Sequence, residues 1–326
     1  MQNNLKKNNV VVLLSILFFT LTLIACSNYN EQINNNETST QIETARSLVT
    51  ENLNEKRVFP KIDGSTANMP MMAQIKSDYM GIPLVDAQND INNVSTTDYA
   101  WVYLAEGKSD ILLVYEPSPD TIKELGDKID NLQICTIGVD ALVFLKNKGN
   151  VVNNLTIEDL QNIYMGNITN WKELGGSDSK IEAFQRSHLS GSQTLFLKLL
   201  MKDKTPMVAL EGYELGDMGG VMTTLAIYDN ESNAIGYSVY YYAKKMNDNP
   251  KLALFDVNGI MANDENIENG KYPLLNKYYV AIRKDEPSDS PARKLYNYII
   301  SDEGKESIKK AGYIPVSNPE EIQFKS

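Results

Sequence analysis

The chain has 326 residues, of which 42% are hydrophobic and 22% charged, and its formal net charge is −11 at pH 7. This acidic surplus repels the phosphate backbone of nucleic acid and argues against a basic, membrane-hugging face. The chain contains 2 cysteines and 1 histidine. We therefore expect neither a disulfide-stapled scaffold nor a metal centre built from His and Cys.

The N-terminus combines two lysines with an apolar run. Lys6 and Lys7 precede the run from Val10 to Ala25, and Cys26 follows directly. A charged start and a short apolar segment are typical of a secretory signal peptide. Ala25 before Cys26 resembles a bacterial lipobox. We expect residues 1–25 to be a lipoprotein signal peptide, and Cys26 to carry a lipid such as palmitate at the outer face of the cell membrane. A retained anchor and secretion without lipid are the alternatives.

Residues 26–57 are rich in Asn, Glu, Thr and Gln and contain few large apolar side chains. Such a segment cannot bury enough apolar surface to offset the entropy lost on ordering. We expect it to be a flexible tether, with a weak helix from Ile42 to Leu53.

Beyond the tether, strand and helix patterns alternate, which is typical of an α/β fold. The patterns predict strands at Val58–Ile62, Ile111–Tyr115, Ile137–Lys146, Ile181–Phe184 and Tyr278–Arg283. They predict helices over Met72–Tyr79 with Gly81 as the stop, over Ser118–Leu125, after the cap Thr156 with Asp159 in the first turn, over Leu195–Met201, and over Pro291–Ile300. Asn233–Tyr237 leads into a strand or helix at Tyr240–Lys244.

Hydroxyl side chains stand between the first predicted strand and the first predicted helix. Ser65 and Thr66 occupy this junction. Hydroxyls and free backbone N–H groups at a helix start can face an anion. Simple N-capping is the alternative role of these two residues.

A second junction carries a fixed positive charge. Arg186 is followed by the small-residue segment Ser190–Thr194, which opens into the apolar run Leu195–Met201. A guanidinium fork, short hydroxyls and N–H groups at a helix start together make an anion pocket. Alternatively the segment is an ordinary turn beside a surface arginine, because Gly and Ser dominate turns.

Two motifs precede this junction, Asn154–Thr156 and Gly166–Trp171, the second followed by Gly175 and Gly176. In this order the three motifs resemble the NLT, GxITNW and R…SGSxT series of the phosphate-binding proteins of ABC importers. That family is a branch of the type II solute-binding superfamily. The resemblance covers most of the chain from about Val58 to Val316. We expect Trp171 to be packed and the two glycines to end its helix.

The resemblance implies the two-lobe type II periplasmic-binding-protein fold, α/β in class, with a hinge of two crossing strands. Lobe 1 would comprise residues 58–138 and 273–326, and lobe 2 residues 139–272. The crossings would lie near Gly138 and Tyr272.

The resemblance also implies site residues in both lobes. Lobe 1 would contribute Ser65, Thr66 and Thr96, with Ser95 as the alternative to Thr96. Lobe 2 would contribute Arg186, Ser190, Gly191, Ser192 and Gln193.

One stretch departs from the family. After the strand that begins at Ile111, the family shows small residues, then Ser or Asp, then often Arg, whereas this chain has Tyr115 and Glu116. An acidic acceptor there would bind a protonated oxyanion and reject a fully ionised one. The phenol of Tyr115 can donate or accept in the ligand site, or the residue packs in the strand. Glu116 either supplies the acceptor or faces solvent.

Other candidates have plainer interpretations. His188 and Ser190 are too close on one loop for a Ser-His-Asp relay, so His188 is expected at the rim or surface. Cys135 lies in an apolar run and is expected in the core. Tyr240–Tyr242 is expected to be structural rather than a sugar site.

Together these features predict an extracytoplasmic, lipid-anchored solute-binding protein that captures phosphate, or a similar small oxyanion, for an ABC importer. The partners would be the ligand, an ABC permease and, through the lipid, the membrane. We expect a monomer that is not an enzyme and needs no cofactor or metal. One alternative is a sensor or adhesion lipoprotein on the same fold with an altered ligand. Another is a hydrolase on this fold, for which no nucleophile arrangement is visible.

Overall fold

The computed structural model describes residues 57–188, 190–209, 212–216, 218–227 and 233–325. Residues 57–326 form one compact unit. The predicted signal peptide, the tether up to residue 56, the helix at 42–53 and Cys26 lie outside the described residues.

The first half of the sheet belongs to lobe 1. Its strand order is β1 (Ile62–Gly64), β2 (Ile111–Tyr115), β11 (Leu275–Arg283) and β3 (Leu132–Asn147). β1 and β2 are parallel, so both end at the same edge, and β11 runs antiparallel to β2 and β3. β12 (Ile314–Ile322) pairs antiparallel with the first half of β3.

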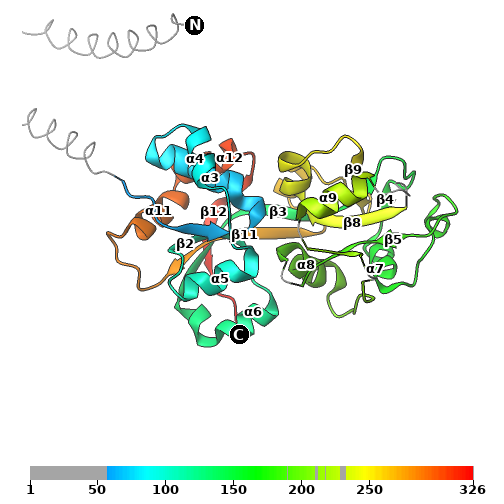
Figure 1. Ribbon diagram of the computed structural model, residues 1–326, viewed down its shortest axis with the longest axis horizontal. Coiled ribbons are helices and arrows are strands. Elements are labelled where there is room, and N and C mark those ends of the chain that lie inside the picture. Colours follow the sequence, from blue (N-terminus) through cyan, green and yellow to red (C-terminus); the bar gives the residue numbers. More distant parts are fainter. Residues whose placement is uncertain (1–56, 189, 210–211, 217, 228–232, 326) are drawn as a thin grey trace, which may run out of the picture. The chain divides into compact units, whose positions relative to one another are not determined.

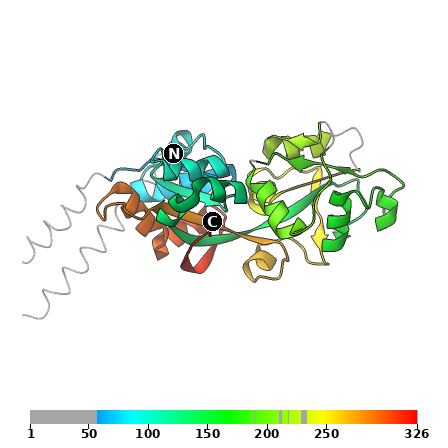
Figure 2. The same cartoon turned by 90° about the horizontal axis from the view of Figure 1, so that it is seen from below.

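The second half of the sheet belongs to lobe 2. Residues 142–146 of β3 pair antiparallel with β8 (Ala234–Val239). β5 (Glu182–Ala183) lies parallel on the far side of β8, and β9 (Leu252–Leu254) pairs with the end of β3. β3 therefore runs through both lobes, and β11 starts beside its middle, where Leu275 pairs with Ala141. Figures 1 and 2 show both strands passing between the two groups of elements.

A glycine permits this crossing to pack. A Cβ added at Gly138 would lie 1.9 Å from the Tyr278 ring of the neighbouring strand, so a larger residue cannot occupy position 138 unless the ring moves. The predicted lobe limits at 138/139 and 272/273 stay predictions. β3 changes its partners between Val139 and Leu142.

Helices cover both faces of the lobe 1 sheet. Ile111, Leu113 and Tyr115 of β2 face one side, while the alternate residues Leu112 and Val114 face the other. The first side is covered by α3 (Met69–Met80), α11 (Pro291–Ile299) and α12 (Asp302–Lys310), and the second by α5 (Thr97–Ala105), α6 (Pro119–Leu125) and η2 (Gly126–Asn131). The short helices η1 (Thr66–Asn68) and α4 (Leu84–Asp90) flank α3.

Lobe 2 is built around aromatic side chains. Phe196 stacks on Tyr237 of β8 with ring centroids 4.4 Å apart, and Phe144 and Tyr164 pack beside them. The remaining elements are β4 (Asn154–Leu155), α7 (Ile157–Met165), η3 (Trp171–Leu174), β6 (Gln185–Arg186), α8 (Gly191–Leu195), η4 (Phe196–Met201), β7 (Glu214–Leu215), α9 (Met218–Ile227), η5 (Tyr242–Met246), β10 (Asp256–Val257) and α10 (Asp264–Glu268).

Several local predictions are confirmed. β2 has the predicted bounds, and α3 ends at Gly81, whose φ of +66° is a left-handed conformation that glycine adopts readily. Thr156 and Asp159 form a reciprocal capping box at the start of α7. Trp171 is buried and stacks on Phe255, and Cys135 is buried.

Other bounds differ from the prediction. The first strand is Ile62–Gly64 rather than Val58–Ile62, because only these residues pair with β2. β3 begins five residues before Ile137, at Leu132, because its first half pairs with β11 and β12. The helix predicted at Leu195–Met201 is a π-helix from Phe196 onward.

Candidate functional site

A cavity of about 270 Å³ lies between the two lobes, at the edge where β1 and β2 end. Its volume suits a small ligand rather than a drug-sized one. The lobe 1 residues that line it are Ser65, Thr66, Thr96, Thr97 and Tyr115, and the lobe 2 residues are Arg186, Ser187, Ser190, Gly191, Ser192, Gly216, Gly219, Val239 and Tyr242.

The lobe 1 wall is a linked set of hydroxyl groups at the ends of strands. Ser65 is buried, and its Oγ lies 2.8 Å from Thr97 Oγ1. The same Ser65 Oγ accepts a hydrogen bond of 3.1 Å from the backbone N–H of Tyr115. These bonds join the end of β1, the end of β2 and the start of α5, so the wall is held in place before a ligand enters.

Helix α5 begins at this wall. Its N-cap, Thr96, has a φ of +78° and makes no capping hydrogen bond with its side chain. Asp63 of β1 instead fixes the approach to α5, because its carboxylate accepts from the backbone N–H of Ser95 at 2.8 Å. A helix start without a side-chain cap offers its first N–H groups to an anion.

The lobe 2 wall centres on Arg186 at the end of β6. Only 6% of the surface of Arg186 is exposed to solvent. The guanidinium donates through Nε to Leu215 O at 3.0 Å and through Nη2 to Gly216 O at 3.3 Å. The hydroxyls of Ser190 and Ser192 lie 2.9 Å apart at the start of α8. A buried guanidinium beside two hydroxyls forms strong, charge-assisted hydrogen bonds to oxyanions.

The two walls meet at Gly191. A Cβ added at this residue would lie 2.4 Å from Thr97 Oγ1 across the cleft, well inside ordinary contact distance. Gly191 has no positive φ, so the requirement for glycine comes from this close approach and not from its backbone conformation. The lobes therefore lie in contact at this point.

Glu116 does not line the cavity. Its carboxylate oxygens accept from Lys198 Nζ of η4 at 2.6 and 2.5 Å. The Glu116 side chain is 16% exposed and that of Lys198 53% exposed. An ion pair beside the cleft thus joins lobe 1 to lobe 2. The charge of Glu116 is balanced by the ammonium group of Lys198 and not by a ligand.

Gln193 does not line the cavity either. Its Oε1 accepts from the hydroxyl of Tyr237 and from the backbone N–H of Arg186. Gln193 therefore holds the backbone of Arg186 from behind.

The other site residues predicted from the sequence line the cavity, namely Ser65, Thr66, Thr96, Tyr115, Arg186, Ser190, Gly191 and Ser192. Thr97 was missed, although it stands beside Thr96 at a helix start. Tyr242 was interpreted as structural, and Gly216 and Gly219 follow a segment without a recognisable pattern. His188 is exposed.

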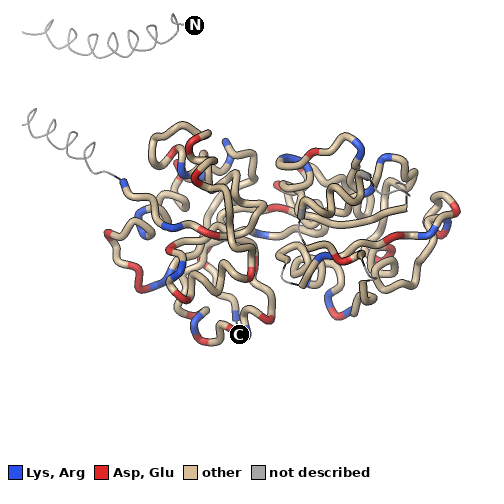
Figure 3. Tube along the Cα trace, viewed as in Figure 1, with Lys and Arg blue, Asp and Glu red and all other residues tan. Residues whose placement is uncertain are grey.

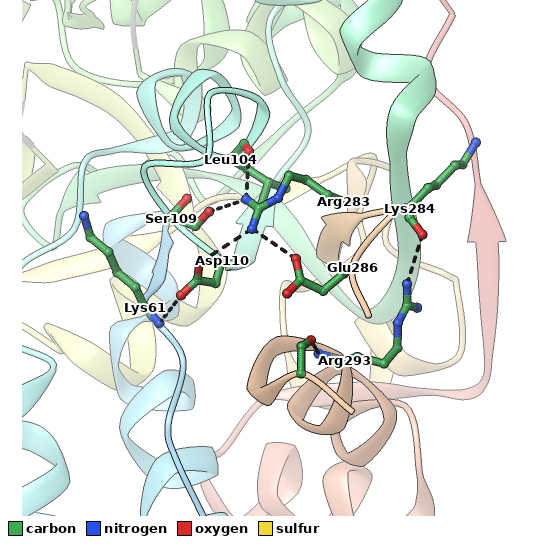
Figure 4. Close-up of polar contacts among 9 residues, drawn as sticks. Lys61, Leu104, Ser109, Asp110, Arg283, Lys284, Glu286 and Arg293 are labelled. Atoms are coloured by element: carbon green, nitrogen blue, oxygen red, sulfur yellow. Dashed lines mark hydrogen bonds and ion pairs between the residues drawn. The ribbon is translucent and has the colours of Figure 1, made fainter. Parts of the chain in front are cut away.

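A second hollow, of about 410 Å³, is lined by Lys128, Arg283 and Lys284 among others. The guanidinium of Arg283 already has hydrogen-bond and ion-pair partners, as Figure 4 shows. Arg283 donates to the carbonyls of Leu104 and Ser109 and pairs with the carboxylates of Asp110 and Glu286. Lys284 Nζ donates to Asp130 O at 2.7 Å. Two carboxylates balance the charge of Arg283, and Lys284 already donates to a backbone carbonyl, so we do not place the anion site here.

Acidic and basic residues are interspersed along the described chain (Figure 3). Among the described residues, no cluster of three or more His, Cys, Asp or Glu could hold a metal ion. In the same part of the chain no helix is long and apolar enough to cross a membrane.

The PBP superfamily domain matches residues 41–303 of the chain. The phosphate-binding protein PstS of Bacillus subtilis is 27% identical over 319 residues, which are 96% of each chain. PstS of Borreliella burgdorferi is 25% identical and covers 81% of this chain and 91% of its own. A Clostridium perfringens protein crystallised with bound phosphate has a TM-score of 0.61 at 23% identity, covering 78% of this chain and 98% of its own.

The chain therefore belongs to the PBP superfamily, and its fold is the two-lobe α/β fold of periplasmic binding proteins. Within that superfamily it is PstS-like.

Proposed function

We propose that the protein captures phosphate, or a closely similar oxyanion, outside the cytoplasm and presents it to an ABC permease. The protein binds its ligand without transforming it. A lipid on Cys26 holds it at the outer face of the cell membrane, and residues 26–57 tether the body to that lipid.

One observation carries the proposal. The buried guanidinium of Arg186 and the hydroxyls of Ser65, Ser190 and Ser192 line one small cavity between two lobes. These groups match the donors that a tetrahedral oxyanion requires on several sides. The relatives from Bacillus subtilis and Borreliella burgdorferi, which are phosphate-binding proteins, support the same ligand.

Binding would desolvate the anion between two walls. Ser65, Thr66, Thr96 and Thr97 with the start of α5 contact it from lobe 1, while Arg186 and the Ser190–Ser192 turn contact it from lobe 2. Excluding water strengthens each charge-assisted hydrogen bond, because the local dielectric constant falls. The net charge of −11 repels an anion at long range, so affinity rests on these local groups and not on steering.

Titration calorimetry of the full-length protein with phosphate, arsenate and sulfate tests the proposal. We expect phosphate to bind and the Arg186→Ala variant to lose at least about 2 kcal/mol, roughly thirtyfold in Kd, which is the scale for a charged hydrogen-bond partner.

Arg293→Ala is the matched control. It removes a guanidinium that donates to Gln133 and to Lys284 O and does not line the cavity. Its affinity for phosphate should equal that of the wild type. No phosphate binding by the wild type would overturn the proposed ligand, and an unchanged Kd in Arg186→Ala would overturn the proposed site.

A further inference from the structure

Asp140 is a buried carboxylate on the strand that crosses between the lobes, and it does not line the main cavity. Its Oδ1 accepts from the backbone N–H groups of Ala141 at 2.8 Å and Tyr241 at 3.2 Å. Its Oδ2 accepts from the hydroxyl of Tyr115 at 2.7 Å. The carboxylate is therefore held by neutral donors, one of which belongs to a residue of the cavity wall.

The bond from Tyr115 fixes the position of one proton. A phenol has a single O–H, and an ionised carboxylate can only accept. While Asp140 is ionised, the Tyr115 proton is committed to Oδ2, and the phenol oxygen has only lone pairs to offer any other group. If Asp140 is protonated, the carboxylic acid can donate to the phenol oxygen, and the Tyr115 proton is released for another acceptor.

We propose that Asp140 sets the hydrogen-bond polarity that Tyr115 presents to the cleft, and that protonation of Asp140 converts Tyr115 from an acceptor into a donor toward the bound oxyanion. This inference rests on the proposed function, since it assumes that an oxyanion occupies the cavity. Asp140 acts as a positioning residue, because it reaches the ligand only through Tyr115.

The surroundings of Asp140 raise its pKa into a range that a binding assay can reach. Burial raises its pKa from 3.8 to about 6, against the lowering effect of the hydrogen bonds from Tyr115 and the backbone. The titratable groups packed around the Tyr115–Asp140 pair are phenols, namely Tyr278 of β11, Tyr240 and Tyr241 after β8, and Tyr313 before β12.

A second, smaller cavity reaches Asp140. Asp140 also lines a small cavity of about 10 Å³, together with Tyr240, Tyr313 and the carboxylate of Asp264. A cavity of this size with polar walls is large enough for one water molecule. The carboxylate of Asp264 pairs with Lys245 Nζ at 2.7 Å, so the charge on that side is balanced.

Sulfate is the sharpest probe, because it carries no proton at any pH of the assay, whereas phosphate itself titrates. We expect sulfate to bind roughly tenfold more tightly at about pH 5 than at about pH 8, because the donor form of Tyr115 is populated only when Asp140 is protonated. Calorimetry, or competition against phosphate, gives both dissociation constants.

Two variants test whether the Tyr115–Asp140 pair causes the pH dependence of sulfate affinity. In Tyr115→Phe the hydroxyl is gone, and in Asp140→Asn the amide cannot titrate, so the pH dependence of sulfate affinity should fall to less than about twofold in each. Tyr278→Phe is the control, since it loses a buried hydroxyl that donates to Ile314 O instead; it should keep the wild-type profile. His188→Gln removes the chain's one imidazole as a source of pH dependence, and it should also keep the profile.

The inference is overturned if wild-type sulfate affinity is the same at both pH values, including no detectable binding at either, or if Tyr115→Phe retains the wild-type profile. These outcomes are distinct from failure of the proposed function, which would appear as an absence of phosphate binding by the wild type at about pH 7.5.

Discussion

Gly191 offers a direct test of whether the ligand is bound by closing the two lobes on each other. In Gly191→Ala the added methyl group would lie 2.4 Å from Thr97 Oγ1, whereas ordinary contacts begin near 3.4 Å. The lobes must therefore separate by about 1 Å at this point, or the neighbouring side chains must strain. Overpacking of this kind costs about 1–3 kcal/mol.

This clash destabilises the closed form, in which the two walls face one ligand. Calorimetry with phosphate should therefore show a Kd raised by between about fivefold and a hundredfold in Gly191→Ala. The midpoint of thermal unfolding without ligand should change little, because opening the cleft relieves the clash without repacking either lobe.

Measuring the effect of Gly191→Ala in a Thr97→Ala background identifies the clashing atom. Thr97→Ala removes Oγ1 and leaves Thr97 Cβ, 3.2 Å from the added methyl group, as the nearest atom. Gly191→Ala should then cost much less affinity when measured against Thr97→Ala than against the wild type. Wild-type affinity in Gly191→Ala, or an equal loss in both backgrounds, would refute closure at this contact.

Two further predictions concern the ion pair and the anchor. Glu116→Gln should weaken phosphate binding by up to about fivefold, with the loss shrinking in about 1 M NaCl, because a partly exposed pair contributes at most about 1 kcal/mol. Exchanging the charges, Glu116→Lys with Lys198→Glu, should restore most of the affinity, and tighter binding by Glu116→Gln would show instead that this carboxylate opposes the ligand. Cys26→Ser should move the protein from the membrane fraction to the soluble fraction of expressing cells, and an unchanged distribution would contradict the lipid anchor.

The parts of the fold that depend on local chemistry could be predicted from the sequence. β2 is a continuous apolar run with both faces buried, and α7 begins with a complete capping box, so the bounds of β2 and the start of α7 could be predicted. α3 ends at a glycine in the left-handed conformation. In these segments the signal lies in residues that are close together in the sequence.

The parts that depend on distant partners could not be predicted in the same way. The first half of β3 is extended because β11 and β12, more than a hundred residues away in sequence, pair with it. β12 itself contains prolines and acidic residues and gives little strand signal. The two-residue strands β6 and β7 exist only because they pair with each other.

The candidate site likewise combines residues that the sequence identifies with residues that only the fold brings together. Arg186 and Ser190–Ser192 were recognisable because they form one ordered motif, and they line the cavity. Thr97 and Tyr242 lie far apart in sequence, and only the folded chain brings them to the same cleft. Glu116 could not be placed from the sequence, because its partner Lys198 belongs to the other lobe.

The most direct measurement is a crystal structure of the protein grown with arsenate, whose heavy atom gives strong scattering. We expect one tetrahedral anion in the cleft, within hydrogen-bond distance of the Arg186 guanidinium, the Ser65 hydroxyl and the Ser190–Ser192 turn. An anion bound instead in the hollow beside Arg283, or a cleft that stays empty while calorimetry reports binding, would contradict this expectation.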